Sequence, residues 1–312
     1  MKKIFTLVAA ALTAATFTAN AEVLLTDNFE YPAGNLLNEG LTNGNWLHYA
    51  AQTGAPIQLV DQALTYDGFQ SSPVGKAVRL TSGGDGQDAM VKFADEPIVA
   101  TSGTTIYAAF LMNVEDLVTA STFSFSFLAP GTSATGTSAV KDGGLPSEIG
   151  RLLIGAGSTA DKYTVRVSRN TISNIQTSKE EFNFGETYLV VLAYEWVEGT
   201  KNDVVKVFMN PTDFKNEPEP TVKTNDASSS DAARLQAFEL RQPANAGVTN
   251  GPNLTVDALR IATSWSELFP PVTAVTDLNV EKVNSVRKYV ENGQVVIENN
   301  GVKYNIAGQV IK

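Results

Sequence analysis

The sequence contains no cysteine and a single histidine, His48. The absence of thiols excludes disulfide bonds, cysteine-type zinc sites and cysteine nucleophiles. A serine–histidine triad has no support either, because no Gly-x-Ser-x-Gly segment accompanies His48. Stability must therefore come from a hydrophobic core, and 312 residues, of which 43% are hydrophobic, are enough to build a large one.

Basic residues are scarce too, with 23 Lys and Arg against 33 Asp and Glu and a formal net charge of -10. Binding to nucleic acids needs clustered Lys and Arg that neutralise phosphates, and the sequence has no such cluster. We therefore predict no nucleic-acid partner. Beyond the N-terminus, no apolar run reaches the about 20 residues of a spanning helix, so no membrane-spanning segment is predicted.

The first 21 residues have the layout of a secretory signal peptide. Lys2 and Lys3 form a basic start, an apolar run extends from Ile4 to Phe17, and small residues flank Asn20. This pattern predicts cleavage after Ala21 and a secreted protein, extracellular or on the outer cell surface. A cysteine-free exported chain suits a bacterial envelope.

From residue 22 to residue 268 the sequence predicts strand after strand. Alternating or β-rich segments are bounded by Gly, Pro, Asp or Ser, and their spacing is typical of a two-sheet antiparallel sandwich. The opening strand, Val23–Glu30, and the closing strand, Val256–Trp265, are expected to lie side by side. Tyr188–Tyr194 is apolar on both faces and is predicted to be a central strand. Residues 129–150 and 212–230 are predicted surface loops.

The end of the chain has a different composition. Residues 269–282, which include Pro270 and Pro271, are predicted to be a linker. Residues 283–312 are predicted to form a small β-module, because Asn292-Gly293 lies between alternating segments as a hairpin turn does.

Two groups of segments resemble known families. Thr26–Tyr31, Gly83–Asp88 and Val256–Ile261 resemble secreted Bacteroidetes proteins that have a laminin-G-like, concanavalin A-like jelly roll. The stretch Asn292-Gly293-Gln294 and the final segment Lys303–Lys312 are similar to the C-terminal sorting modules of the type IX secretion system of that phylum. This resemblance implies secretion machinery as a partner of the tail.

The jelly-roll resemblance implies a structural calcium ion where the first and last strands meet. Asp257 would supply one carboxylate, and Asp27 or Glu30 would complete the ligands together with backbone carbonyls. Hard oxygen donors of this kind suit Ca2+. In the alternative, Asp257 caps a strand end or pairs with an arginine.

The sequence offers little support for catalysis. Glycosidases of this fold carry a Glu-x-Asp-x-x-Glu run on one strand, and no such run occurs here. Polysaccharide lyases of this fold use histidine, tyrosine and arginine in a basic groove, which an acidic chain with one histidine hardly provides. No catalytic residue is predicted, although a carbohydrate-active enzyme stays open as an alternative.

Aromatic side chains can stack on sugar rings, and four are predicted to bind a ligand: Trp46, Tyr49, Tyr66 and Trp196. Each could instead pack in the core, because large aromatic residues are mostly buried. The sequence as a whole favours a secreted, non-catalytic protein that binds glycans through a sandwich face. A structural or adhesion protein of the cell surface is the other alternative.

Overall fold

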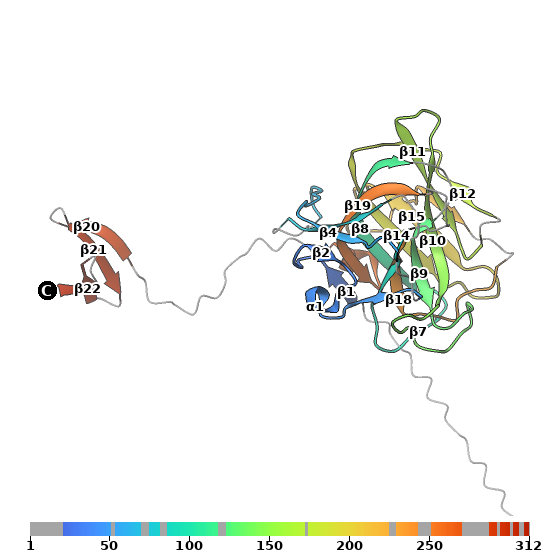
Figure 1. The fold of residues 1–312 in the computed structure, drawn as a ribbon, viewed down its shortest axis with the longest axis horizontal. Helices are drawn as coiled ribbons and strands as arrows, with labels where there is room; N and C mark the ends of the chain where they lie inside the picture. Colours follow the sequence, from blue (N-terminus) through green and yellow to red (C-terminus); the bar gives the residue numbers. More distant parts are fainter. Residues whose placement is uncertain are drawn as a thin grey trace, which may run out of the picture. The chain divides into compact units, whose positions relative to one another are not determined.

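The structure is a computed structural model of the chain and forms two compact units, Met1–Pro270 and Pro271–Lys312 (Figure 1). It describes residues 21–50, 54–69, 75–81, 86–117, 123–171, 174–224, 229–242, 251–269, 287–291, 294–299, 302–305 and 309–311. The predicted signal peptide and the Asn292-Gly293 turn lie outside the described residues, as does nearly all of the predicted linker.

The first unit is built on two antiparallel sheets. Sheet A has nine strands: β16 (Val222–Thr224), β15 (Val204–Met209), β14 (Thr187–Glu195), β8 (Thr105–Leu117), β19 (Pro252–Ala262), β5 (Ala77–Leu80), β4 (Gln58–Val60) and β2 (Gly34–Asn35) in that order, with β1 (Val23–Asp27) paired to β19. The predicted meeting of the opening and closing strands is confirmed, because Asp27 lies opposite Leu259.

Sheet B has eight strands. They are β12 (Gln176–Thr177), β11 (Lys162–Ser168), β10 (Ser147–Ala156), β9 (Phe123–Ala129), β18 (Ala237–Leu240), β6 (Ala89–Lys92) and β3 (Trp46–His48) in that order, with β13 (Phe182–Asn183) paired to β11. A separate two-stranded ladder joins β7 (Ile98–Val99) to β17 (Arg234–Leu235).

The main core lies between the two sheets and follows the period-two alternation of each strand. Phe125 and Phe127 of β9 point into it, and so do Phe238 and Leu240 of β18. Phe110 of β8 lies 4.5 Å from Phe125, measured between ring centroids. Aromatic packing of this kind adds to the free energy gained from burial.

A second apolar layer covers the outer face of sheet A. The helix α2 (Trp265–Leu268) packs there together with Leu64 and Phe69. Strand β14 is consequently buried on both faces, with Val190 in the main core and Val191 in the second layer. The prediction of a central strand at this place is confirmed. Trp265 begins α2, however, and the closing strand already ends at Ala262.

The outer face of sheet B is covered in part by residues 130–146. This segment is shorter than the predicted loop, because β10 begins at Ser147. Val140 is buried against Met90 and Leu128, and its backbone N–H donates to the Gln236 side chain at 2.8 Å. The segment is therefore fixed to the sheet by an apolar contact and a hydrogen bond.

The second unit is a four-stranded antiparallel sheet of β20 (Arg287–Glu291), β21 (Gln294–Asn299), β22 (Val302–Tyr304) and β23 (Val310–Ile311). The predicted fold class is confirmed: an all-β chain with a two-sheet antiparallel jelly-roll sandwich and a small C-terminal β-module. Both described helices, α1 (Glu39–Thr42) and α2, are far shorter than a bilayer is thick, and among the described residues no helix could cross a membrane.

Candidate functional site

Charged side chains gather on the outer face of sheet B. Because Phe238 and Leu240 of β18 point into the core, Glu239 and Arg241 point the other way. The same alternation turns Ser124 and Ser126 of β9 outward. We call the group on this face the polar cluster; its members are Tyr49, Asp88, Glu148, Arg151, Glu239 and Arg241.

A backbone irregularity in β10 brings two members of the cluster together. Glu148 and Arg151 are three residues apart and would point to opposite faces of a regular strand. The pairing of β10 with β9 shifts register between Ile149 and Leu152, and Gly150 has φ of 62°. With this bulge Ile149 and Leu152 both reach the core, so Glu148 and Arg151 share the outer face.

Ion pairs connect the cluster across three strands. The Arg151 guanidinium donates to Glu148 Oε2 at 3.0 Å, and Arg241 lies 3.7 Å from Glu148 Oε1. Arg241 also lies 3.5 Å from Asp88 Oδ2. Glu148 thus stands between two guanidinium groups, with a hydrogen bond to Arg151 and a longer ion pair to Arg241.

Glu239 is the most deeply buried member of the cluster, with 0% exposure. Burial, reinforced by the negative charges of Asp88 and Glu148, raises the pKa of Glu239 to about 8. Ser126 donates a hydrogen bond of 2.6 Å to its Oε2, whereas its Oε1 has no partner among the described residues. The hydroxyls of Ser124 and Ser168 on the same face are buried as well and have no hydrogen-bond partner in the described part of the chain. Unpaired buried polar atoms are rare and call for an explanation.

Tyr49 connects the cluster to residues 130–146. Its hydroxyl donates to the Pro146 carbonyl at 3.3 Å. Burial and the charges of Glu148 and Glu239 raise the pKa of Tyr49, which keeps the phenol protonated. Next to it, His48 contacts Asp142 at 3.0 Å. Of the four predicted aromatic ligands, Tyr49 is the one that lies in the cluster.

The other three predicted aromatic ligands lie elsewhere. Trp46 is 2% exposed, stacks on Phe29 and donates from its indole nitrogen to Asp27. Tyr66 packs on the second apolar layer over sheet A. Trp196 is 2% exposed, yet it lines a cavity at one end of the sandwich. The structure therefore does not bring the four together.

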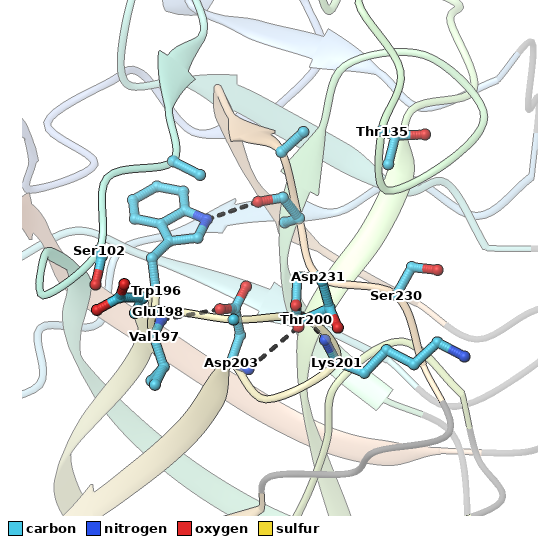
Figure 2. Close-up of a pocket in the computed structure, with 14 residues that line it drawn as sticks. Ser102, Thr135, Trp196, Val197, Glu198, Thr200, Lys201, Asp203, Ser230 and Asp231 are labelled. Atoms are coloured by element: carbon cyan, nitrogen blue, oxygen red, sulfur yellow. Dashed lines mark hydrogen bonds between the residues drawn. The ribbon is translucent and has the colours of Figure 1, made fainter.

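The cavity beside Trp196, which we call the end pocket, has a volume of about 550 Å3 (Figure 2). It is formed by the β14–β15 connection, the β7–β8 connection, Thr135 and residues 230–233. The Trp196 indole nitrogen donates to the Ala232 carbonyl at 2.7 Å. This bond fixes the ring at the wall of the pocket.

A network of buried charged residues holds the residues that line the end pocket. Arg169 has 0% exposure and donates to Asp231 Oδ1 at 2.7 Å and to the Asp203 carbonyl at 3.3 Å. Asp203 accepts from the Tyr194 hydroxyl at 2.7 Å and from the Val197 N–H at 2.9 Å. Burial raises the pKa of Asp203 against the opposing effect of these bonds.

The three predicted calcium ligands lie near the junction of β1 and β19. Burial, together with the negative charges of Asp27 and Glu30, raises the pKa of Asp257 to about 6. Both carboxylates are already engaged, however: Asp257 accepts from the N–H groups of Leu64 and Ala258, and Asp27 accepts from Phe29, Tyr31 and Trp46. Across the described residues, no three acidic or His side chains are arranged to hold a metal ion.

Comparisons with known proteins concern the fold. No protein-family profile and no curated protein matches the chain. Among solved structures, an alginate lyase in complex with alginate trisaccharide has a TM-score of 0.43 at 13% identity and covers 76% of this chain and 96% of its own. A carbohydrate esterase from a Shiga toxin-encoding bacteriophage has a TM-score of 0.42 at 16% identity, covering 78% and 99%. Peanut lectin has a TM-score of 0.37 at 12% identity, covering 79% and 98%. Likeness at this level carries no information about ligand or reaction.

Proposed function

We propose that this chain is a secreted or cell-surface protein that binds glycans without catalysis, and that the polar cluster on sheet B is its binding face. One observation carries the proposal. Hydrogen-bonding groups of Glu239, Ser124 and Ser168 are buried on one sheet face without a partner among the described residues. The same face carries the partly exposed side chains of Tyr49, Glu148, Arg151 and Arg241, which a ligand can reach.

The surrounding residues suit a hydroxylated ligand. The partly exposed side chains of Arg151, Arg241 and Glu148 bring guanidinium groups and a carboxylate to this face. Tyr49 presents an aromatic ring with a polar tip at the edge of the cluster. A sugar chain offers the complementary mixture of hydroxyl donors, hydroxyl acceptors and apolar ring faces.

A glycan array with the mature protein tests this proposal. We expect binding to a subset of plant, host or microbial glycans, and at least about a tenfold loss of affinity in Arg241→Gln, since truncating a central polar contact costs about 1.4 kcal/mol or more. Arg79→Gln is the matched control, because Arg79 also pairs with a glutamate, Glu115, but lies on sheet A. Silence across the whole array would refute the glycan ligand.

A carbohydrate-active enzyme is the second candidate, and the raised pKa of Glu239 favours it. Two carboxyl groups with different environments, one protonated and one ionised, can act as general acid and base at a glycosidic bond. Glu239 and Glu148 are on one sheet face, separated by the single strand β9. New reducing ends released from a glycan that binds, and lost in Glu239→Gln, would establish this reaction.

Export remains part of the proposal. The N-terminal pattern supports secretion to the extracellular space or the outer surface, and the similarity of the C-terminal segment to sorting modules supports recognition by secretion machinery. Fusing residues 283–312 to a periplasmic reporter would test the tail, with surface delivery as the expected result.

The calcium ion at the β1–β19 junction stays a prediction, supported by the mutual repulsion of three carboxylates. We expect Ca2+ to raise the melting temperature of the wild-type protein by several degrees, because binding to the native state alone stabilises it. Asp257→Asn should abolish that response. A melting temperature that is the same in calcium and in chelator would reject the ion.

A further inference from the structure

We propose that the end pocket is a second carbohydrate site, separate from the polar cluster, which takes one neutral sugar ring against its apolar wall. The polar groups around this pocket fall into two sets. Asp203 and Asp231 accept hydrogen bonds from the protein at both carboxylate oxygens. The second set consists of exposed residues that line the cavity: Ser102, Thr135, Glu198, Thr200, Lys201 and Ser230.

The first set makes the pocket rigid before any ligand arrives. Asp231 accepts from the Arg169 guanidinium and from the backbone N–H groups of Lys201 and Asp203, which fixes the β14–β15 connection to residues 230–233. The Ala232 N–H donates to the Tyr194 hydroxyl at 2.9 Å. A preformed pocket spares the ligand the cost of ordering its walls.

The second set defines the chemistry of the ligand. Figure 2 shows the indole of Trp196 and the side chain of Thr135 on different sides of the pocket, and Thr200 belongs to the β14–β15 connection. Trp196, Val197 and the alanines at positions 100, 232 and 233 supply apolar surface. An apolar wall beside several exposed hydroxyls fits a molecule with one apolar face and a rim of hydroxyl groups.

Charge excludes the main competing ligands. Glu198 and Lys201 bring one exposed carboxylate and one exposed ammonium to the pocket, so neither a strongly anionic nor a strongly cationic ligand gains a net attraction. A pocket volume of about 550 Å3 is also too small for a folded partner and lies within the range of small-molecule sites. A neutral monosaccharide, or the terminal ring of a glycan, meets all of these conditions.

This site goes beyond the proposed binding face and does not depend on it. The end pocket and the polar cluster share no residue. If both bind sugars, one molecule holds two points of a glycan and gains avidity without any new contact.

Fluorine NMR on protein labelled with 5-fluorotryptophan tests the proposal. The sequence has three tryptophans, and neither Trp46 nor Trp265 lines the end pocket; their indole nitrogens donate to Asp27 and Asp213. Glucose, galactose, mannose and N-acetylglucosamine are titrated separately, and Trp196→Phe assigns the resonance. We expect at least one sugar to shift the Trp196 resonance saturably, with a Kd of about 1–10 mM, and to leave the other two resonances in place.

Two variants separate this pocket from the polar cluster. The double variant Thr135→Val/Thr200→Val should weaken the sugar at least fivefold, because it removes two hydroxyls without changing side-chain size, while the melting temperature shows whether the fold is kept. Arg241→Gln should leave the Trp196 response unchanged even if it abolishes binding on the array. No saturable shift with any of the four sugars, or a shift that the double threonine variant leaves unaltered, would overturn the proposal.

Discussion

Replacing Glu239 by glutamine should make the protein more stable at neutral and mildly alkaline pH. The pKa of Glu239 in the native state is about 8, against an ordinary value of 4.5. Between these two values the native state keeps a proton that the unfolded state has lost, so wild-type stability falls as the pH rises. Above about pH 8 the full cost of a buried carboxylate is present. Glutamine is neutral at every pH and still offers Ser126 an oxygen.

The measurement is urea denaturation of both proteins across this pH range. The free energy of unfolding of Glu239→Gln minus that of the wild type should increase from pH 4.5 to pH 8 by on the order of 3 kcal/mol. Glu219→Gln removes a carboxylate from the exposed surface and serves as control; its difference from wild type should be flat over the same range. Parallel curves for Glu239→Gln and wild type would show that Glu239 is ionised in the native protein.

The fold could be predicted from the sequence because burial imposes alternation on every strand. Phe125 and Phe127 mark the core side of β9, and the doubly apolar run around Val190 marks a strand covered on both faces. Turn sequences and changes in composition predicted the boundaries between strands and the boundary of the C-terminal module. Alternation does not show which segments pack together. The second apolar layer around α2 was therefore missed, since its residues come from five separate stretches of the chain.

The polar cluster was missed for a related reason. Glu239 and Arg241 alternate with core residues just as solvent-exposed residues do, so their sequence pattern predicts an ordinary half-exposed strand. Their burial depends on β9 and β10 as neighbours and on the bulge at Gly150. The available signal was that two charged residues, Glu239 and Arg241, lie in or next to the short apolar strand β18, but which strands flank it follows only from the topology.

The aromatic residues show that residue type alone does not identify a binding site. Trp46 and Trp196 are equally inaccessible, at 2% exposure, and both indole nitrogens donate to a buried acceptor. The difference between them lies in the surroundings. The Trp196 ring borders a cavity that is also lined by exposed hydroxyls, whereas the Trp46 ring stacks on Phe29 within the core. Cavities depend on loop conformation, which the sequence does not specify.

Arg169→Met should be among the most destabilising single substitutions in the sandwich. The guanidinium is fully buried and donates to Asp231, to the Asp203 carbonyl and to the Ser229 carbonyl. Methionine fills much of the volume but leaves these acceptors without their donor. Breaking a buried ion pair from one side costs about 3–5 kcal/mol, and we expect a loss of this size in the free energy of unfolding.

A double-mutant cycle with Asp231→Asn identifies the cause of that loss. If the cost arises from an uncompensated carboxylate, the pair Arg169→Met/Asp231→Asn should be more stable than Arg169→Met alone. Asp231 also positions the Lys201 and Asp203 N–H groups, so both single variants should abolish the Trp196 response to sugar. A loss below about 1 kcal/mol in Arg169→Met, or additive effects in the cycle, would mean that apolar packing rather than this charge network holds the end pocket in shape.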